Sequence, residues 1–374
     1  MVSEEVKVAH TLYQSGKFAN PFYQLDTGLT AHVAPGYPYL LASLLRWFGT
    51  GARGAFAIQN LETIALVLQI GLLPLLARQL GGSLQTGLIA AAIALIGLRR
   101  DWYWECSYVG LLLIVETILY ANYLRTDSIL TATLAGVTWG ILLLFSPSAL
   151  VVLIASILLA GLLHRRILRL LLFTALPLLV TTPWIWHQYH VFGHFIFIRD
   201  NFGIEMAASF NERAQYRSTK SAVDLSHPNQ NRAEAERVIA LGEPEYNALK
   251  LHEARMWVEA NLHKAISLVC QRLFYFWLPP IDMRNPISSA VIWCSTLLST
   301  FGLVALWRTH RTGALVISSF LLCFPLVYYI VQYIPRYRYP IAWVTFLLSG
   351  FAVEAFPRGA TRRRPQELNA HNKA

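Results

Sequence analysis

Residues 129–163 read ILTATLAGVTWGILLLFSPSALVVLIASILLAGLL, and this stretch decides the fold class. It contains no charged residue, and Ser146–Pro147 divides it into two apolar blocks. Each block is close to the roughly 17–25 residues that an α-helix needs to cross a hydrocarbon core of about 30 Å. Arginines stand at both ends, with Arg125 before the stretch and Arg165 after it. The pattern therefore predicts a hairpin of two membrane-spanning helices whose charged ends share one side of a bilayer.

The composition of the whole chain points the same way. Of its 374 residues, 55% are hydrophobic and 14% are charged, whereas soluble domains carry about 25% charged residues. This composition excludes a water-soluble globular enzyme. The net charge of +10 does not require a nucleic-acid partner, because cationic cytoplasmic loops of a membrane protein give the same sum. The four cysteines are scattered and show neither metal-ligand spacing nor a disulfide framework.

Further apolar blocks predict an all-α polytopic membrane protein. We expect spanning helices at 55–80, 83–98, 105–124, 129–146, 148–163, 167–186, 288–307, 313–334 and 340–356. Arginines cluster on one side of this arrangement, and that side is predicted to be the cytoplasm because cytoplasmic loops are enriched in Lys and Arg. These arginines are Arg78, Arg125, Arg165, Arg166, Arg169, Arg308, Arg311, Arg358, Arg362, Arg363 and Arg364.

This orientation divides the chain into an exterior head, two transmembrane parts, an exterior cap and a basic tail. The boundaries are 1–53 for the first exterior loop with amphipathic interfacial helices, 54–186 for transmembrane helices, 187–285 for a small helical exterior cap, 286–357 for further transmembrane helices, and 358–374 for the cytoplasmic tail. A polar head outside the membrane ordinarily follows a hydrophobic segment. We therefore expect that a preceding transmembrane helix is missing from this sequence, with an unaided translocated tail as the alternative.

The head begins with a predicted amphipathic helix at residues 3–14, where apolar residues recur at helical spacing. Glu4 and Glu5 stand in its first turn. They fit equally well as ordinary acids that favour the helix dipole, or as a carboxylate at the membrane surface that acts as general base on an acceptor hydroxyl. Asp26 and His32 lie in the Gly/Pro-rich loop that follows, either as hydrogen-bonded turn residues or as support for such a site.

Several other segments of the exterior parts are predicted to be helical. Residues 37–48 are apolar enough for a second interfacial helix. The cap is expected to hold two amphipathic helices divided at Gly242–Pro244, and a further amphipathic helix is expected near 262–278. His190 and His194 are four residues apart, but Gly193 between them breaks a helix, so we expect no metal site from them.

Several motifs together resemble one family of membrane enzymes. They are GKFANPF (16–22), TGLTAHVAPGYPYLLASLLRWFG (27–49), PWIWHQYHVFGHFIFIRDNFGIE (183–205) and IPRYRYPI (334–341), with weaker matches in VETIL (115–119) and LLLFSPSALVVL (142–153). In this order they are similar to bacterial GT-C membrane glycosyltransferases. These are relatives of glycosyltransferase family 39, which includes protein O-mannosyltransferases and the lipid A aminoarabinose transferase. The resemblance covers nearly the whole chain, but it departs at Ser146–Pro147, where the family more often has Arg-Pro.

The resemblance implies a GT-C-like helix bundle that transfers a sugar from a polyprenyl-phosphate carrier to an acceptor. In the family an acidic residue of the first exterior loop serves as base, and that position maps onto Glu4, with Glu5 as the reserve candidate. Many relatives carry Asp-Glu where this chain has Glu4–Glu5.

The same resemblance implies where the chain works and with what. The location is the bacterial plasma membrane, with a multi-pass chain whose active site faces outward. The partners are membrane lipid, the polyprenyl-phosphate sugar and an acceptor that is a protein, a lipid or a glycan, and no nucleic acid. No cofactor is assigned, no metal ligand is identified, and a requirement for a divalent metal is left open.

A departing polyprenyl phosphate gains negative charge, so the site needs cations near the outer membrane surface. Arg336 and Arg338 flank Tyr337 just before a span, and a guanidinium can pair with a phosphate through two hydrogen bonds. Interfacial arginines that snorkel beside aromatic residues give the same pattern. Arg199 is a third candidate cation for the phosphate, or else it forms a salt bridge with Asp200.

Charges in unexpected places also need an explanation. An acid in hydrocarbon costs about 3 kcal/mol, so Glu62 and Glu116, which lie inside predicted spans, should find partners. For Glu116 a structural pairing is favoured over a catalytic or metal-binding role. Arg100 and Asp101 lie on the outer side, against the positive-inside trend. They are candidates for binding the carrier phosphate or steering the acceptor, with interfacial packing as the alternative.

Three functions are compatible with this pattern. The first is a hexosyl- or pentosyltransferase that depends on a polyprenyl-phosphate sugar. The second is a transporter or lipid-carrier flippase, which would show paired broken helices and an internal repeat, and no repeat is evident. The third is a catalytically degenerate, truncated GT-C homologue. The sequence has no P-loop, no dinucleotide-binding fingerprint and no Ser-His-Asp arrangement, so it gives no support to nucleotide hydrolysis, dinucleotide redox chemistry or serine hydrolysis.

Overall fold

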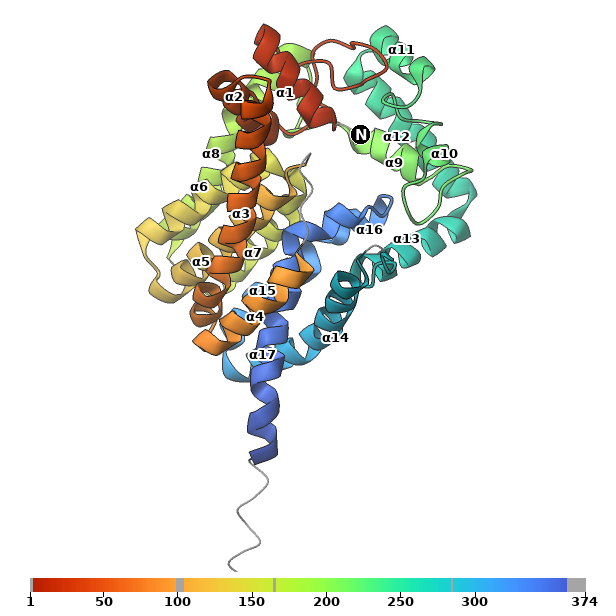
Figure 1. The fold of residues 1–374 in the computed structure, drawn as a ribbon. Helices are drawn as coiled ribbons and strands as arrows, with labels where there is room; N and C mark the ends of the chain where they lie inside the picture. The colour runs from red at the N-terminus through yellow and green to blue at the C-terminus, as the bar shows by residue number, and fades with distance from the viewer. Residues whose placement is uncertain (1–2, 99–103, 164–165, 284, 362–374) are drawn as a thin grey trace, which may run out of the picture.

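The computed structural model describes residues 3–98, 104–163, 166–283 and 285–361, with side chains as far as Phe356. Every regular element within these ranges is a helix, and extended backbone pairs only at two isolated bridges. The predicted all-α fold class is therefore confirmed. Figure 1 shows a helix bundle. The N-terminal helices and most of the helical cap (residues 202–277) lie at one end of it, and α17 (Ala342–Thr361) projects from the other end.

The N-terminal head forms two helices, α1 (Glu4–Ser15) and α2 (Gly36–Phe48), as predicted. The Ser3 hydroxyl accepts a hydrogen bond from the Val6 amide at 3.2 Å and so caps the start of α1. Gly16 ends the helix with a φ of 73°, a left-handed conformation that glycine adopts without a steric penalty. The Ser3 hydrogen bond fixes the start of α1, so that Glu4 and Glu5 stand in its first turn.

The bundle contains all nine apolar blocks as helices. Among the described residues, six stretches are long and apolar enough to cross a membrane: α3 (Ala52–Gln79), α5 (Cys106–Thr126), α8 (Ile167–Phe192), α14 (Pro286–Thr309), Arg311–Ile330 with α15 (Arg311–Cys323) and α16 (Leu326–Ile330), and Pro335–Phe356 with η2 (Pro335–Ile341) and most of α17. The shorter apolar helices are α4 (Leu84–Gly97), α6 (Ile129–Phe145), and η1 (Pro147–Ala149) with α7 (Leu150–Leu163). The chain is therefore a multi-pass membrane protein.

One predicted span is interrupted. The sequence predicts a continuous helix over 313–334, but α15 ends at Cys323 and the short α16 ends at Ile330. Pro325 accounts for the break, because proline has no amide hydrogen to donate to the carbonyl four residues earlier and its ring clashes with that carbonyl. The consequence is that α16 leaves the axis of α15 and turns toward the cap (Figure 1).

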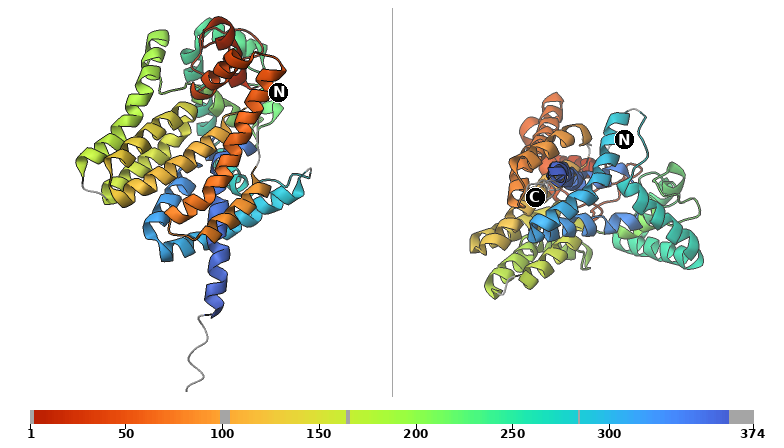
Figure 2. Two further views of the ribbon diagram at one scale, coloured as in Figure 1. Left: turned by 60° about the vertical axis from the view of Figure 1, so that its left-hand side comes forward. Right: turned by 90° about the horizontal axis from the view of Figure 1, so that it is seen from below.

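The cap consists of five helices between α8 and α14. They are α9 (Phe202–Ser209), α10 (Lys220–Val223), α11 (Arg232–Leu241), α12 (Glu243–Ala260) and α13 (Leu262–Trp277). Gly242, with a φ of 87°, divides α11 from α12 as predicted, and α13 confirms the helix expected near 262–278. Figure 1 places α11 and α12 at the same end of the bundle as the head, whereas α13 lies lower, beside α16 and α14. Figure 2 shows the same structure from two further sides.

Buried Arg272 joins the cap to the bundle. Its guanidinium donates hydrogen bonds to the Ile330 carbonyl of α16 and the Ser209 carbonyl of α9, each at 2.5 Å. It also lies 4.7 Å from the ring centroid of Phe210, a distance that allows a cation–π interaction. Because an arginine is rarely buried without such partners, this residue fixes α16 against the cap.

Helices α14 and α17 pack so closely that their contact leaves no room for a side chain. A methyl group on Gly302 would lie 1.8 Å from the carbonyl oxygen of Leu348. Gly71 of α3 has open space where its methyl group would be. The two glycines therefore form a matched pair for testing the packing of the bundle.

We predict that Gly302→Ala lowers the free energy of unfolding by about 1–3 kcal/mol, because the added methyl group forces α14 and α17 apart. Gly71→Ala should leave the melting temperature unchanged or raise it slightly, because alanine favours helix. Thermal unfolding of the purified protein in detergent measures both. Equal melting temperatures for the two variants would contradict this packing.

Candidate functional site

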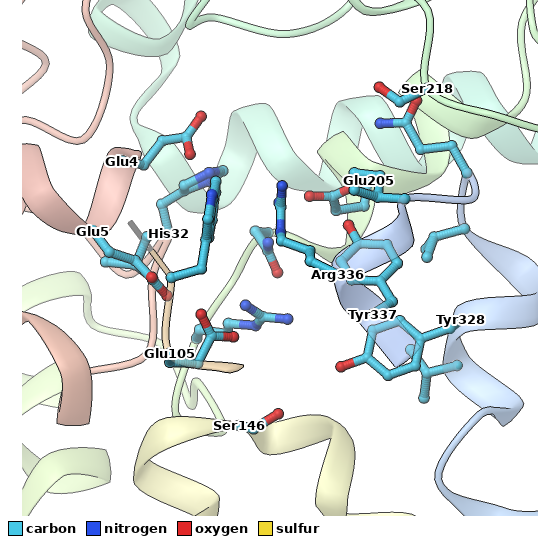
Figure 3. A pocket seen from close by; sticks show the side chains of 18 of the residues that line it. Glu4, Glu5, His32, Glu105, Ser146, Glu205, Ser218, Tyr328, Arg336 and Tyr337 are labelled. Atoms are coloured by element: carbon cyan, nitrogen blue, oxygen red, sulfur yellow. The ribbon is translucent and has the colours of Figure 1, made fainter. Parts of the chain in front are cut away.

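The head, the cap and the late part of the chain surround a cavity of about 250 Å³. Its walls come from α1, the loop before α2, the start of α5, the segment entering α9, and the α16–η2 region. Charged side chains of both signs line this cavity (Figure 3). The acids, arginines and histidines of the lining are Glu4, Glu5, His32, Glu105, Arg199, Glu205, His227 and Arg336.

Glu4 is held in the cavity by the cap. Its Oε1 accepts a hydrogen bond from Asn229 Nδ2 at 2.8 Å, and Asn229 Oδ1 accepts one from the Tyr23 amide at 2.8 Å. Burial raises the pKa of the Glu4 carboxyl, while its own backbone amide, the positive charge of Arg336 and the Asn229 hydrogen bond oppose that rise. The result is an oriented carboxyl whose proton affinity is greater than in water.

Glu5 lies next to another acid on one side of the cavity. Its side chain is 2% exposed, and its carboxyl points toward Glu105 (Figure 3). Burial raises the pKa of Glu5 well above its ordinary value, and the charge of Glu105 and a hydrogen bond with it raise the pKa further. Arg199 and Arg336 act in the opposite direction. Arg336 is thus the charge that acts on both Glu4 and Glu5.

Glu105 was not identified from the sequence. It stands immediately before α5, at the start of the predicted span 105–124. The one signal in the sequence was an acid at the start of an apolar block, next to Trp104.

Arg336 supplies positive charge opposite Glu4. Its guanidinium carbon lies 3.5 Å from the centroid of the Trp104 ring, so the aromatic face supports the cation. Glu4 and Glu105 are close enough to interact electrostatically with it. The structure therefore brings the predicted base and one of the predicted phosphate-binding arginines to the same cavity.

Arg199 reaches the cavity from a strained turn. Ile198 has a φ of 68°, which β-branched residues rarely adopt. The turn is held in place because the Trp184 indole donates a hydrogen bond to the Ile198 carbonyl at 2.7 Å, and the Asp200 amide donates one to the Ala31 carbonyl at 2.7 Å. The Asp200 carboxyl accepts a hydrogen bond from Asn247.

Arg338 lies apart from this cavity. It is 4% exposed and donates hydrogen bonds to the Trp277 carbonyl and to Thr296 Oγ1, each at 2.6 Å. It lines an adjacent groove of about 470 Å³. Ser218 and Ile334 line both this groove and the cavity that contains Glu4. The two predicted arginines of the 334–341 motif are therefore placed at different surfaces.

The remaining predicted residues are dispersed. His32 is buried and lines the cavity. Asp26 is exposed outside it and forms an ion pair with Lys7 at 3.1 Å. Glu116 is buried in α5 away from the cavity, and neither of its carboxylate oxygens has a hydrogen-bond partner among the described residues. The expected partner of Glu116 is thus not found within those ranges. Arg100 and Asp101 lie outside the described residues.

Within the described part of the chain, Glu4, His32 and His227 are the group that could hold a metal ion. One ligand atom from each lies within 4.8 Å of the others. Burial lowers the pKa of both histidines, so both imidazoles are neutral near pH 7, as metal ligation requires. Among the residues that the structure describes, His32 Nδ1 has no hydrogen-bond partner. This mixed nitrogen and oxygen set fits a cation such as Zn²⁺, and the sequence did not predict it.

The loop that carries His32 is fixed by Glu243 of α12. This buried carboxyl accepts hydrogen bonds from Thr30 Oγ1 at 2.7 Å and from the Ala31 amide at 2.6 Å. Burial raises the pKa of Glu243 to about 8, and the charge of Asp200 adds to the rise. At neutral pH Glu243 is therefore mainly protonated in the folded protein.

The sequence matches no protein-family model and no curated protein. The fold is similar to the crystal structure of the Archaeoglobus fulgidus oligosaccharyltransferase in complex with Zn and sulfate, with 13% identity and a TM-score of 0.56 over 97% of this chain and 46% of that chain. The same enzyme, AglB, in complex with an inhibitory peptide and a dolichol-phosphate matches with 13% identity and a TM-score of 0.54 over 97% of this chain and 48% of that chain.

ArnT from Cupriavidus metallidurans bound to undecaprenyl phosphate is also matched, with 15% identity over 96% of this chain and 75% of that chain. Its TM-score of 0.42 is too low to establish a shared fold. The chain spans about half the length of the oligosaccharyltransferase structures. The oligosaccharyltransferase matches confirm the GT-C-like fold that was expected from the sequence motifs.

We predict that Glu243→Gln changes how stability depends on pH. The folded-state pKa of Glu243 is raised, so its contribution to stability is present below the ordinary value of 4.5 and is lost as the pH rises through about 8. Glutamine cannot ionise. Between pH 7 and pH 9 the wild type should therefore lose about 1 kcal/mol or more relative to the variant. Thermal unfolding of both proteins at the two pH values measures this, and parallel losses would contradict it.

Proposed function

We propose that this chain transfers a sugar from a polyprenyl-phosphate-linked donor to an acceptor at the outer face of a bacterial plasma membrane. The observation that carries the proposal is the meeting of Glu4 and Arg336 in one cavity of a GT-C-like bundle. One is a base for the acceptor, and the other is a cation for the departing phosphate.

In this proposal Glu4 acts as general base. A base works best when its pKa lies near the working pH, and burial moves the pKa of Glu4 upward. The hydrogen bond from Asn229 fixes the direction of the carboxyl. Glu5 is the reserve candidate, although burial and the neighbouring Glu105 favour the protonated form of Glu5, which cannot act as a base.

Arg336 and Arg199 would bind the phosphate of the carrier. When the bond between sugar and phosphate breaks, its electron pair stays on the phosphate oxygen, so the leaving group gains a negative charge. Guanidinium groups in a site shielded from water stabilise that charge. We assign Arg338 a positioning role, because its hydrogen bonds to Trp277 and Thr296 orient the segment that bears Arg336.

The arginines in the last turns of three helices support an outward-facing site. Helix α5 runs from Glu105 at the cavity to a last turn that contains Arg125, and the last turns of α3 and α14 contain Arg78 and Arg308. Arginines are enriched on the cytoplasmic side, so the cavity end would face outward. A divalent cation held by Glu4, His32 and His227 would add positive charge at the reacting centre.

We predict that Glu4→Gln reduces transfer about 100-fold or more, because the acceptor hydroxyl loses its base. Mass spectrometry of envelope glycans and lipid-linked sugars, in a deletion strain complemented with either form, measures the product. Glu236→Gln is the matched control, since Glu236 lies exposed on α11 in an ion pair with Arg232. Product levels equal to wild type would remove Glu4 as the base.

We predict that Arg336→Gln weakens binding of undecaprenyl phosphate about 10-fold or more, because a charge-assisted hydrogen bond contributes roughly 1.5–3 kcal/mol. Arg213→Gln should bind the lipid like wild type, because Arg213 is exposed and does not line the cavity. Native mass spectrometry of the purified protein titrated with the lipid gives both affinities. An unchanged affinity of the Arg336 variant would rule out its role in phosphate binding.

A further inference from the structure

A row of three hydroxyl groups lies at the floor of the cavity. Ser146 Oγ is 2.8 Å from Ser148 Oγ, which is 2.9 Å from the Tyr328 hydroxyl. Ser146 ends α6, Ser148 belongs to η1, and Tyr328 belongs to α16. Ser146 and Tyr328 line the cavity directly, and Figure 3 shows both hydroxyls at its lower side.

This row has hydrogen-bonding capacity left over for a ligand. Three hydroxyls carry three protons, and the two hydrogen bonds within the row use two of them. As no other partner of this row is found in the described part of the chain, one proton and lone pairs of the end hydroxyls, Ser146 and Tyr328, remain. A buried polar group of this kind is costly unless a partner satisfies it, and Ser146 is only 5% exposed.

An aromatic surface lies beside the hydroxyls. The rings of Tyr328 and Tyr337 stack with centroids 4.6 Å apart and an interplanar angle of 28°, and both residues line the cavity. Tyr337 directly follows Arg336 in the chain. A sugar is attached directly to its phosphate, so a phosphate bound at Arg336 would bring the sugar to this aromatic and hydroxyl-bearing floor.

We infer that Ser146, Ser148, Tyr328 and Tyr337 form the subsite for the donor sugar, and that this subsite takes an uncharged sugar with free hydroxyls. The inference rests on the proposed function. A sugar hydroxyl both donates and accepts hydrogen bonds, so it can satisfy the leftover proton and the lone pairs together. The apolar face of the sugar ring then packs on the tyrosines.

Charged sugars fit this floor less well. An ammonium group only donates hydrogen bonds, and a carboxylate only accepts them. Either would also have to shed its water against neutral hydroxyls, which costs free energy without an opposite charge in the floor. Figure 3 shows Glu105 and Arg336 above Ser146 and Tyr328. The charge of Glu105 reaches Tyr328, but it also acts on Arg336, which carries the opposite charge.

The test compares five ligands on the purified full chain: undecaprenyl phosphate alone, and undecaprenyl phosphate that carries glucose, mannose, glucosamine or glucuronic acid. We expect at least one of the two neutral hexoses to bind about 10-fold or more tightly than either charged sugar. Tyr328→Phe and Ser146→Ala should each weaken the neutral-hexose carrier about 3- to 10-fold, the effect of one lost hydrogen bond. Neither variant should alter the affinity for undecaprenyl phosphate alone.

Tyr329→Phe is the matched control. Its hydroxyl accepts a hydrogen bond from the Trp277 indole at 2.7 Å and does not line the cavity. In Tyr329→Phe the ratio of the affinity for the hexose-bearing carrier to the affinity for the bare carrier should equal the wild-type ratio. A ratio of two affinities does not depend on the fraction of protein that is folded.

Three results would overturn the inference. The first is tighter binding of a charged sugar, and the second is an equal loss of bare and hexose-bearing carrier in the Tyr328 and Ser146 variants. In both of these cases the carrier still binds, so the proposed function stands. The third is failure of wild type to bind any of the carriers, which would overturn the proposed function and the sugar subsite together.

Discussion

Opposite charges that are half-buried in one cavity are the constraint on which the rest of the structure depends. A carboxylate or guanidinium removed from water is tolerated only when it is paired or hydrogen-bonded. Glu4 meets this condition through Asn229 and the charge of Arg336, and Arg336 meets it through Glu4 and the ring of Trp104. Each charge acts on the other, so the head and the end of the chain are electrostatically complementary where they meet.

The cap makes that meeting precise. Asn229 reaches Glu4 across 225 residues of sequence, and Glu243 holds the loop that carries His32. Arg272 fixes α16 to the cap, and α16 in turn brings Tyr328 to the cavity. The cavity is therefore assembled from segments that are each anchored at a distance from it. This preorganisation is what catalysis by charge stabilisation requires.

The sequence predicted the fold well because a membrane-spanning helix can be recognised from its own apolar stretch. An apolar stretch such as 129–163 needs no knowledge of the rest of the chain to be read as a hairpin. The exception is the block 313–334, where Pro325 ends the helix although the hydropathy continues. The prediction followed hydropathy, and backbone geometry decided the structure.

The site was less accessible to sequence reasoning, because long-range packing assembles it. Arg336 and Arg338 are two residues apart and look alike in sequence, but the tight turn of η2 points them to different surfaces. Glu105 and His227 carry no motif of their own, and the folding of the cap and the bundle brings them to Glu4.

The most direct test of the central claim is a cryo-electron microscopy structure of the full chain with undecaprenyl phosphate. The account predicts density for the phosphate between Arg336 and Arg199, on the side of the cavity that faces Glu4. Phosphate density bound at Arg338 in the adjacent groove, or at the opposite end of the bundle, would contradict it.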